Sequence, residues 1–430
     1  SVRTGHVGDV WWQRASVLVV VAGWMACHAV LADARADWTL MAYLSGDGEL
    51  EGAAVGYVQM LASVGGSDRV HVAVQLDRRE GGDATPPDFA DTRRLIIEQS
   101  ENGPGGIAME GAEELGEVDM ASGEALAAFV RWVRERCPAR RYGLVVMGHG
   151  SGLVELPHPF VRVPPQVCGL CHDETSGTQM SAAELGRVLR SLADEAGRPP
   201  VDVLCLDACL TALLEVVYEL RGGCRFVTAS EYVMLTPGAP WDQILRGLVA
   251  WPDMSAREFA GNYVRQAAGY WARVPEVAVT HSAIDVPRAA GLAERLGRLS
   301  ERLASRISES APAITYARAS SQSFGSQRQY VDLGQFVGIL AERHPDEVTR
   351  ELAREVAADV DAAVLAEYHC GTEPDGGKEP TGLSVFFPPN LSELPEAYRT
   401  SAGLARETGW GEFLETYLGH VRGMFAREAA

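Results

Sequence analysis

The sequence predicts an α/β protein in which a mostly parallel sheet is sandwiched by helices and followed by a helical or mixed C-terminal extension. Three observations support this fold class. Strand-like apolar runs alternate with helical segments, as in parallel sheets that carry helices on both faces. Two runs, 142–147 and 201–206, are rich in β-branched residues, which is typical of strands buried on both faces. With 47% hydrophobic and 22% charged residues over 430 positions, the composition is that of a folded globular protein.

Each predicted strand is a short apolar run bounded by turn or helix signals. The stretch 81–119 is rich in Gly, Pro and acids and indicates a loop or hairpin with one strand-like piece at 94–98. Residues 153–167 carry four prolines, which exclude a regular helix. We expect strands at 38–44, 70–76, 142–147, 201–206, 225–229 and 277–284, with helices near 50–62, 122–136, 181–196, 209–221 and 255–271.

The pattern changes at about residue 286. Amphipathic helices are predicted at 287–308 and 346–368, followed by a strand at 382–387 and a last helix near 410–426. We therefore divide the chain into three parts. They are a signal peptide (1–36), an α/β domain (37–285) and an α-rich C-terminal extension or subdomain (286–430).

The first 36 residues have the features of an export signal. Arg3 and Arg14 precede an apolar stretch at 15–26, and small residues follow up to Ala36. Cleavage after Ala36 would start the mature chain at Asp37. No later apolar run is long enough for a stable membrane span. We expect an exported protein, either secreted or held in the periplasm or cell envelope.

Charge and cysteine content limit the possible partners. The net charge of −20 would repel a phosphate backbone, so we expect no nucleic-acid partner. The same acidic surface would attract cationic peptides. Cys27 lies in the predicted signal, and the remaining seven of the eight cysteines are an odd number, so at least one is expected to be free. The sequence indicates no oligomeric state.

A reactive side chain follows each of two predicted strands. His149 comes after 142–147 and is flanked by glycines, and Cys209 comes after 201–206 in the run Asp207-Ala-Cys. The carboxyl ends of neighbouring parallel strands meet at one edge of the sheet, where ligands bind. We therefore expect the imidazole and the thiol to face one crevice, which is the minimum equipment for thiolate catalysis.

With these motifs in order, the chain resembles the clostripain family of cysteine peptidases, relatives of the caspase-like fold that includes gingipains and legumains. The resemblance covers about residues 38–285. It rests on the segment 38–51 (WTLMAYLSGDGELE), on His149-Gly150, on the DETSG segment at 173–177 and on Asp207-Ala-Cys209. It implies a caspase-like sheet, His149 as the general base, Cys209 as the nucleophile, and cleavage after Arg or Lys.

The chemistry of the two residues suits these roles. A free thiol has a pKa of about 8.5, and an adjacent imidazole together with the start of the predicted helix would lower the pKa of Cys209. We predict that the backbone N–H groups of Gly150 and Cys209 stabilise the oxyanion. Hydrolysis would proceed through a thioester acyl-enzyme, with His149 protonating the leaving amine and then activating water.

Asp207 has two interpretations. It could form the floor of the S1 pocket and pair with an Arg or Lys of the substrate, or it could cap the helix that follows. The resemblance favours the pocket. Relatives often carry a second acid in the Gly-rich loop before the Trp, where this chain has PGAPW at 237–241. Asp242 and Glu231 are the candidates to replace that acid.

The loop between base and nucleophile contains a further candidate. Members of the family mature by self-cleavage after a basic residue in this region, and Arg162 lies within the Pro-rich stretch. Arg162 is therefore the possible autocleavage site. The alternative is an ordinary solvated loop arginine.

The predicted chemistry requires no cofactor. Calcium is kept as an option, because some members use it and acids such as Asp47 and Glu49 follow the first strand. The motif Cys168-Gly-Leu-Cys171-His172 has the spacing of covalent c-type haem attachment. As a zinc site, the same three side chains lack an obvious fourth ligand. A local disulfide or two ordinary cysteines is the preferred interpretation.

Together these observations predict an exported cysteine endopeptidase that acts on a polypeptide with a basic residue at the cut. One alternative is a non-catalytic exported binding protein on the same caspase-like fold. The other is a c-type haem protein that uses Cys168, Cys171 and His172.

Overall fold

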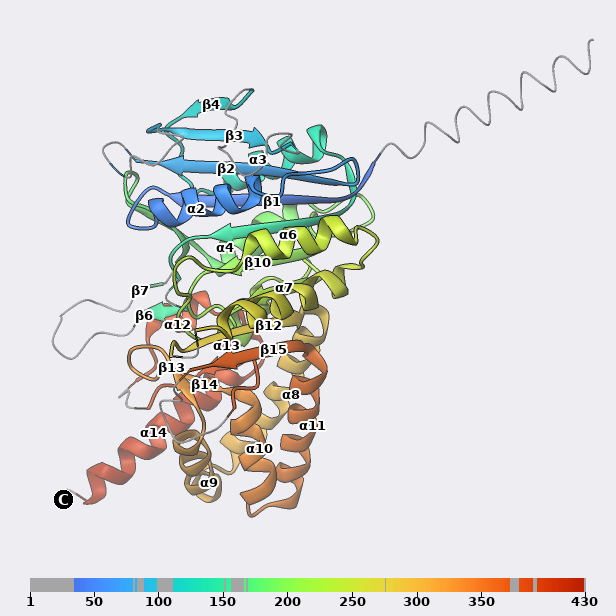
Figure 1. Cartoon of the computed structure of the whole chain (residues 1–430). Coiled ribbons are helices and arrows are strands. Elements are labelled where there is room, and N and C mark those ends of the chain that lie inside the picture. Colours follow the sequence, from blue (N-terminus) through green and yellow to red (C-terminus); the bar gives the residue numbers. More distant parts are fainter. Residues whose placement is uncertain are drawn as a thin grey trace, which may run out of the picture.

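The computed structural model describes residues 35–79, 82, 89–98, 111–150, 152–155, 166–167, 169–274, 276–371, 379–389 and 393–428. Its centre is a nine-stranded sheet with the strand order β15-β12-β11-β10-β5-β1-β2-β3-β4 (Figure 1). The strands of this sheet are β1 (Ala36–Gly46), β2 (Val70–Arg78), β3 (Thr92–Ile96), β4 (Glu113–Gly116), β5 (Ala139–Met147), β10 (Val203–Asp207), β11 (Phe226–Ala229), β12 (Val279–Asp285) and β15 (Val364–Cys370).

The middle of the sheet is parallel and both ends are antiparallel. Strands β11, β10, β5, β1 and β2 run in the same direction. The outer strands β12 and β15 at one end, and β3 and β4 at the other, alternate in direction. The prediction of a mostly parallel sheet is confirmed.

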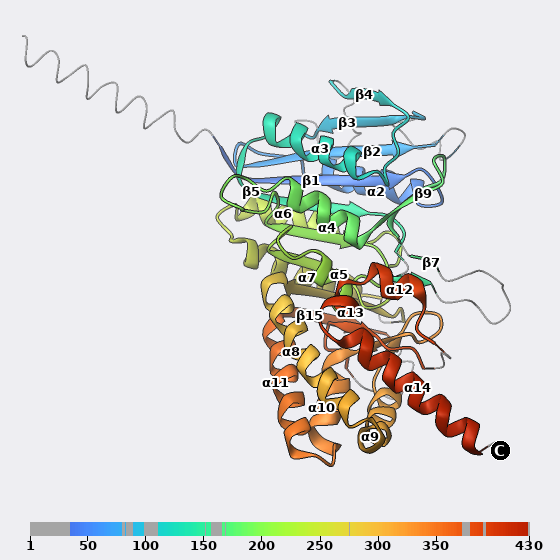
Figure 2. The same ribbon diagram turned by 180° about the vertical axis from the view of Figure 1, so that it is seen from behind.

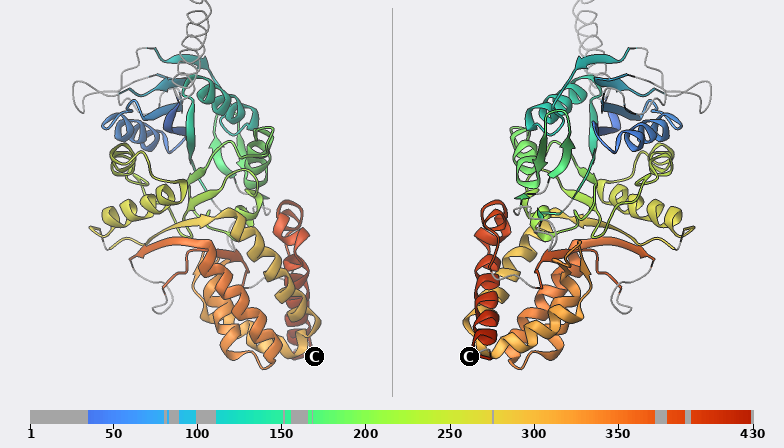
Figure 3. Two further views of the ribbon diagram at one scale, coloured as in Figure 1. Left: turned by 90° about the vertical axis from the view of Figure 1, so that its right-hand side faces the viewer. Right: turned by 90° about the vertical axis from the view of Figure 1, so that its left-hand side faces the viewer.

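Helices cover both faces of the sheet (Figure 2; Figure 3). One face is covered by α2 (Glu51–Ala62), α6 (Trp241–Ala250) and α7 (Ala256–Trp271), and the other by α3 (Gly123–Arg136), α4 (Ala182–Ser191) and α5 (Leu214–Glu219). Strand β1 shows why two layers are needed. Its residues Leu40, Ala42 and Leu44 belong to the core with α2, whereas Met41 and Tyr43 belong to the opposite core. Successive side chains of a strand point to opposite faces, so a fully apolar strand must be covered twice.

The C-terminal part forms a helical bundle at the β15 end of the sheet (Figure 1). Asp285 caps its first helix by accepting a hydrogen bond from the Arg288 N–H at 3.2 Å. The bundle helices are α8 (Val286–Ser305), α9 (Ile307–Ser320), α10 (Leu333–Arg343) and α11 (Glu347–Ala363), and α12 (Glu396–Ser401), α13 (Gly403–Glu407) and α14 (Trp410–Glu428) follow.

This part is not separate from the sheet, because α11 runs directly into the edge strand β15, which pairs with β12. The single helix predicted at 346–368 is therefore wrong beyond Ala363. The predicted boundary at 285 coincides with the end of β12, but the segment after it supplies one strand of the central sheet.

Three short sheets complete the fold. β13 (Ser323–Phe324), β14 (Tyr330–Asp332) and β16 (Ser384–Phe386) form the first, and the other two are the pairs β6 (Val154–Glu155) with β7 (Gln166–Val167) and β8 (Gly169–Asp173) with β9 (Thr178–Ser181). The sequence did not predict helices α6, α9 and α10. The predicted signal peptide falls on residues 1–36, of which 1–34 lie outside the described residues. Within the described part of the chain, no helix combines the length and apolar character that crossing a membrane requires.

Candidate active site

His149 and Cys209 lie at the ends of two neighbouring parallel strands. Strand β5 ends at Met147 and strand β10 ends at Asp207, and these two residues are paired in the sheet register. His149 and Cys209 each follow two positions later, so the register places them side by side at the C-terminal edge. Both residues line one pocket of about 260 Å³. The arrangement expected from the sequence is therefore present.

Gly150 allows the two strand ends to approach each other closely. A Cβ atom on Gly150 would lie 2.4 Å from the carbonyl oxygen of Cys209 and 2.8 Å from its amide nitrogen. Only glycine avoids that clash. Among the described residues, the N–H groups of Gly150 and Cys209 donate to no backbone carbonyl. This is the state that an oxyanion donor must have before substrate binds, and the oxyanion role stays a prediction.

The environment of the Cys209 thiol differs from the one expected. Burial raises its pKa, and the N–H of Met234, which donates to Sγ at 3.2 Å, lowers it. The predicted help from a helix start is wrong, because α5 begins only at Leu214. Leu210 has a φ of 57°, outside the helical region, and so separates Cys209 from that helix. A resting thiol with a raised pKa depends more strongly on a neighbouring base to remove its proton.

The carboxylate of Asp207 is held by three side chains. Tyr57 Oη and Trp241 Nε1 donate to Oδ2 at 2.8 and 2.7 Å, and Tyr263 Oη donates to Oδ1 at 2.6 Å. Asp207 is 4% exposed and contributes to the lining of the pocket. Burial raises its pKa, while the three hydrogen bonds oppose that shift. The helix-cap interpretation is wrong, because the N-cap of α5 is Leu213.

Sequence reasoning missed the three residues that hold Asp207. Tyr57 lies on α2, Trp241 begins α6 and Tyr263 lies on α7, so all three come from the helical layer on one face of the sheet. The sequence feature that could have pointed to them is Gly-Ala-Pro before Trp241, because its glycine packs against Tyr57. Gly238 has a φ of 83° and passes so close to Tyr57 that a Cβ would lie 1.8 Å from its hydroxyl oxygen.

The remaining pocket wall consists of two segments. Leu50 and Ala53 approach from the start of α2, and residues 233–238 form the opposite wall. Neither candidate for the second acid lines the pocket. Glu231 is fully buried and accepts hydrogen bonds from Gly382 N at 3.0 Å and Ser384 Oγ at 2.5 Å. Asp207 is the acid that the described residues place at this pocket.

The Cys-Gly-Leu-Cys-His motif is only partly described. Cys168 and Arg162 lie outside the described residues. Cys171 is in β8 with no exposed surface, and burial raises the pKa of its thiol to about 12. A thiol enclosed in this way cannot form a thioether to a haem placed at the surface. His172, in contrast, is exposed, and its ring centroid lies 6.5 Å from that of His149.

The other cysteines in the described part of the chain are unpaired. Cys205 is fully buried inside β10, and burial raises the pKa of its thiol. Cys209 is only partly buried and lines the pocket. The cysteines that the structure describes as free are Cys137, Cys171, Cys205, Cys209, Cys224 and Cys370.

A thiol and an imidazole share a pocket at the C-terminal edge of a sheet flanked by helices, which is the arrangement that thiolate catalysis requires. Comparison with known proteins agrees. The chain belongs to the clostripain family, whose sequence profile matches residues 58–417.

One curated relative and two solved structures illustrate the relationship. Clostripain of Hathewaya histolytica is 26% identical over 227 residues, which cover 48% of this chain but only 41% of that protein. A secreted cysteine protease from Bacteroides thetaiotaomicron, solved with an irreversible peptide inhibitor, has a TM-score of 0.62 at 16% identity and covers 87% of this chain and 99% of that one. An inactive zymogen from Parabacteroides distasonis has a TM-score of 0.59 at 18% identity, covering 88% and 98%. These two likenesses show the fold.

Proposed function

We propose that the protein is an exported cysteine endopeptidase that cleaves polypeptides after arginine or lysine. One observation carries the proposal. The pocket that His149 and Cys209 line is also lined by Asp207, whose carboxylate is buried and fixed by three hydrogen bonds. A nucleophile, a base and an acid are thus assembled in a single cavity of about 260 Å³, a suitable size for one side chain of a substrate.

The reaction begins with proton transfer from the Cys209 thiol to His149. The thiolate attacks the scissile carbonyl carbon, and the negative charge that develops on the carbonyl oxygen is stabilised by the N–H groups of Gly150 and Cys209. His149 then gives the proton to the leaving amine, the C–N bond breaks and a thioester remains. In the second half, His149 takes a proton from water, the hydroxide attacks the thioester, and the thiol and a carboxylic acid are released.

Asp207 accounts for the preference for a basic residue. A guanidinium or ammonium group that enters the pocket leaves water, so it needs a fixed partner of opposite charge. The Asp207 carboxylate is already oriented by Tyr57, Trp241 and Tyr263, so little ordering is required when the substrate binds.

The test is a panel of fluorogenic peptides that differ only at the residue before the cut. Arginine is compared with citrulline, its uncharged analogue, and lysine with norleucine. We expect cleavage of the two basic peptides. The Cys209→Ala and His149→Ala variants should each reduce kcat/KM by at least about 1,000-fold, because both residues act in every bond-making step.

Covalent labelling provides a separate readout. A chloromethyl ketone with a basic residue should label the wild-type protein once, and Cys209→Ala should abolish that labelling. Thr211→Ser, a conservative change two residues from Cys209, is the matched control and should leave labelling intact. Equal turnover by wild type and Cys209→Ala would refute the mechanism. A labelled but inactive wild type would favour the alternative of a binding protein.

Two finer parts of the proposal use the same samples. We infer that the chain cleaves itself after Arg162, and mass spectrometry of an active wild-type sample should show a cut there that the Cys209→Ala protein lacks. An uncut chain in a fully active sample would exclude this step.

We also infer export, and sequencing the amino end of the protein released by its own host should give Asp37, which leaves β1 complete except for Ala36.

A further inference from the structure

The ring of His149 lies next to the ring of a second histidine, His172. The two rings are nearly perpendicular, with an interplanar angle of 77° and centroids 6.5 Å apart. Aromatic rings that meet edge to face prefer this arrangement, with centroids about 4.5–7 Å apart. Both side chains are exposed, so the pair lies at the surface of the site.

The imidazole of His149 has no hydrogen-bond partner among the described residues. In most pairs of a nucleophile and a histidine, a third group accepts the second ring N–H and so fixes the orientation of the ring. That orientation matters, because the ring must face Cys209 to take the thiol proton, and an exposed side chain otherwise moves between rotamers. In the described part of the chain, the contact with His172 is the side-chain interaction available to restrain the ring.

The backbone that carries His172 is firmly held. His172 lies in strand β8 and pairs with Gln179 of β9. Its carbonyl oxygen accepts a hydrogen bond from Ser45 Oγ of β1 at 2.7 Å. The residues on either side of it, Cys171 and Asp173, are both fully buried. An exposed ring is thus carried on a strand whose position is fixed by the core.

Strand β8 also lies directly against the chain just before His149. A Cβ atom on Gly148 would lie 2.9 Å from the carbonyl oxygen of Leu170 and 3.2 Å from the Cα of Cys171. The two backbones that carry the histidines are therefore in close contact, and a glycine at position 148 permits it. His149 lines the catalytic pocket and His172 does not, so His172 contacts the base from outside the space that a substrate side chain would fill.

We propose that His172 is a positioning residue, whose ring holds the imidazole of His149 edge to face in the orientation that faces Cys209. This role depends on the proposed function, in which His149 is the general base. In this role His172 transfers no proton and binds no substrate. Another aromatic ring should therefore replace it, whereas an aliphatic side chain of similar volume should not. The histidine of the Cys-Gly-Leu-Cys-His motif thereby acquires a function that needs no haem.

The first test measures kcat and KM separately for an arginine peptide cleaved by the full chain. His172→Leu should lower kcat by about three- to tenfold, the range expected when one aromatic contact is lost, and should leave KM unchanged. His172→Phe should keep kcat within about twofold of the wild type. Thr175→Ala is the matched control, because it changes another exposed side chain that follows the same strand, and it should have no effect. All three variants should melt at the wild-type temperature, since the side chains are exposed.

The second test follows alkylation of Cys209 by iodoacetamide near neutral pH, with mass spectrometry of the peptide that contains Cys209. The reaction requires the thiolate, so its rate reports how well His149 removes the thiol proton. His172→Leu should slow it about three- to tenfold. In a His149→Ala background, His172→Leu should cause no further change, because a residue that acts through the base has nothing to position once the base is gone.

Several results would each overturn the positioning role. They are wild-type kcat and alkylation in His172→Leu, a rise in KM at constant kcat, and an alkylation loss that persists without His149. A loss in His172→Phe as large as that in His172→Leu would also overturn it, because the imidazole itself would then be required. Alkylation needs no peptide, so the role is tested even if no peptide of the panel is cleaved. Conversely, an active wild type with an indifferent His172→Leu leaves the proposed peptidase function intact.

Discussion

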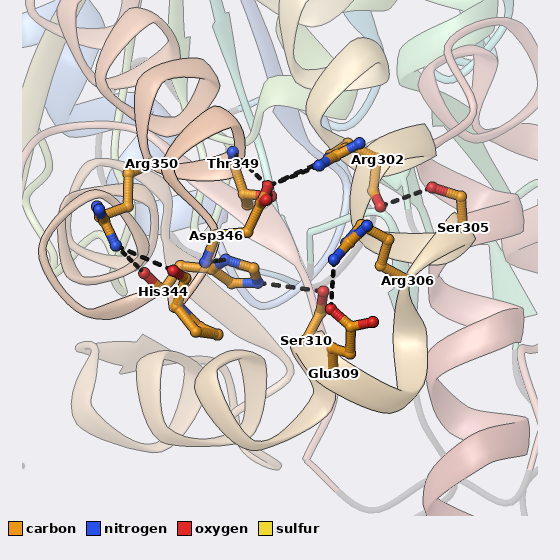
Figure 4. Close-up of polar contacts among 10 residues, drawn as sticks. Arg302, Ser305, Arg306, Glu309, Ser310, His344, Asp346, Thr349 and Arg350 are labelled. Atoms are coloured by element: carbon orange, nitrogen blue, oxygen red, sulfur yellow. Dashed lines mark hydrogen bonds and ion pairs between the residues drawn. The ribbon is translucent and has the colours of Figure 1, made fainter.

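Two groups of charged residues, one in the helical extension and one at the edge of the sheet, differ in how their charges are satisfied. In the extension, Asp346 caps helix α11 and accepts at Oδ2 from Thr349 N at 3.0 Å and from Arg302 Nη2 at 2.8 Å (Figure 4). His344 is bonded at both ring nitrogens, to Asp346 N and to Ser310 Oγ, each at 3.1 Å. The Arg302 and Thr349 donors hold the pKa of Asp346 well below its usual range.

At the edge of the sheet the balance is reversed. Asp77 accepts one side-chain hydrogen bond, from Thr92, and forms no ion pair with a described residue, and burial raises its pKa to about 8. Asp207 has three donors but no basic partner in the described residues, and burial raises its pKa. The charge of Asp346 is neutralised by the protein itself, through Arg302. At the sheet edge the acids are left for something that binds, which is the pattern expected of functional sites.

Removing the charge of Asp207 should have the largest effect among the changes that test this difference between the two regions. Asp207→Asn should reduce kcat/KM for an arginine peptide by about 100-fold or more, because a buried charge pair is worth roughly 2–5 kcal/mol when one partner is removed. For the matching citrulline peptide, kcat/KM should change by less than about threefold. Steady-state kinetics with both peptides measures this difference directly.

Asp202→Asn is the control for that experiment. Asp202 directly precedes the first residue of the same strand and accepts a hydrogen bond from Tyr142 N at 2.9 Å. It should not change the ratio between the two peptides. The contrary outcome is that Asp207→Asn lowers kcat/KM for both peptides equally and destabilises the protein. In that case Asp207 is a structural acid of the same kind as Asp346, and the difference between the two regions does not hold for Asp207.

Glu215 provides a further test of this difference, because it is a buried acid of the structural core that forms no ion pair with a described residue. It is fully buried and accepts at Oε1 from Phe386 N at 3.0 Å and Tyr398 Oη at 2.8 Å. Burial raises its pKa from 4.5 to about 7. The folded state therefore holds a proton more tightly than the unfolded chain, and the free energy of unfolding falls as the pH rises from about 4.5 to 7.

Glu215→Gln should remove this part of the pH dependence. The variant should match the parent near pH 4.5 and exceed it above pH 7 by up to about 3 kcal/mol. Urea unfolding at both pH values, in the Cys209→Ala background, measures the difference, and contributions from other acids cancel between the two proteins. A constant difference at both pH values would mean that Glu215 is not protonated in the folded state at low pH.

The catalytic pair could be predicted from sequence because each residue follows its own strand. The apolar runs identified β5 and β10, and a parallel sheet brings their carboxyl ends together whatever the exact register. The same reasoning could not identify Tyr57, Trp241 and Tyr263 as partners of Asp207, because they lie on three helices whose packing depends on the whole core.

The errors in the fold also have physical causes. Helix α9 contains Pro312, so its sequence is not typical of a regular helix. Helix α6 directly follows a Pro-Gly-Ala-Pro turn, and no helix was predicted there. The last residues of the helix predicted at 346–368 form β15 instead, because β12 offers them an antiparallel partner about 85 residues earlier in the chain. Local sequence patterns cannot predict this long-range pairing of β15 with β12.

The smallest expected effect concerns the extension itself. Asp346→Ala removes both the helix cap and the ion pair with Arg302, so the melting temperature should fall by a few degrees. Asp346→Asn keeps a good capping residue and loses only the charge, so its melting temperature should fall less. Glu351→Gln, which changes an exposed acid on the same helix, should have no measurable effect. Activity per folded molecule should stay constant in all three, because Asp346 and Glu351 pair with arginines of the extension and neither lines the pocket. A loss of activity in Asp346→Asn at a temperature where the chain is fully folded would show that the two regions are coupled, and that the extension has a direct role in the function of the sheet edge.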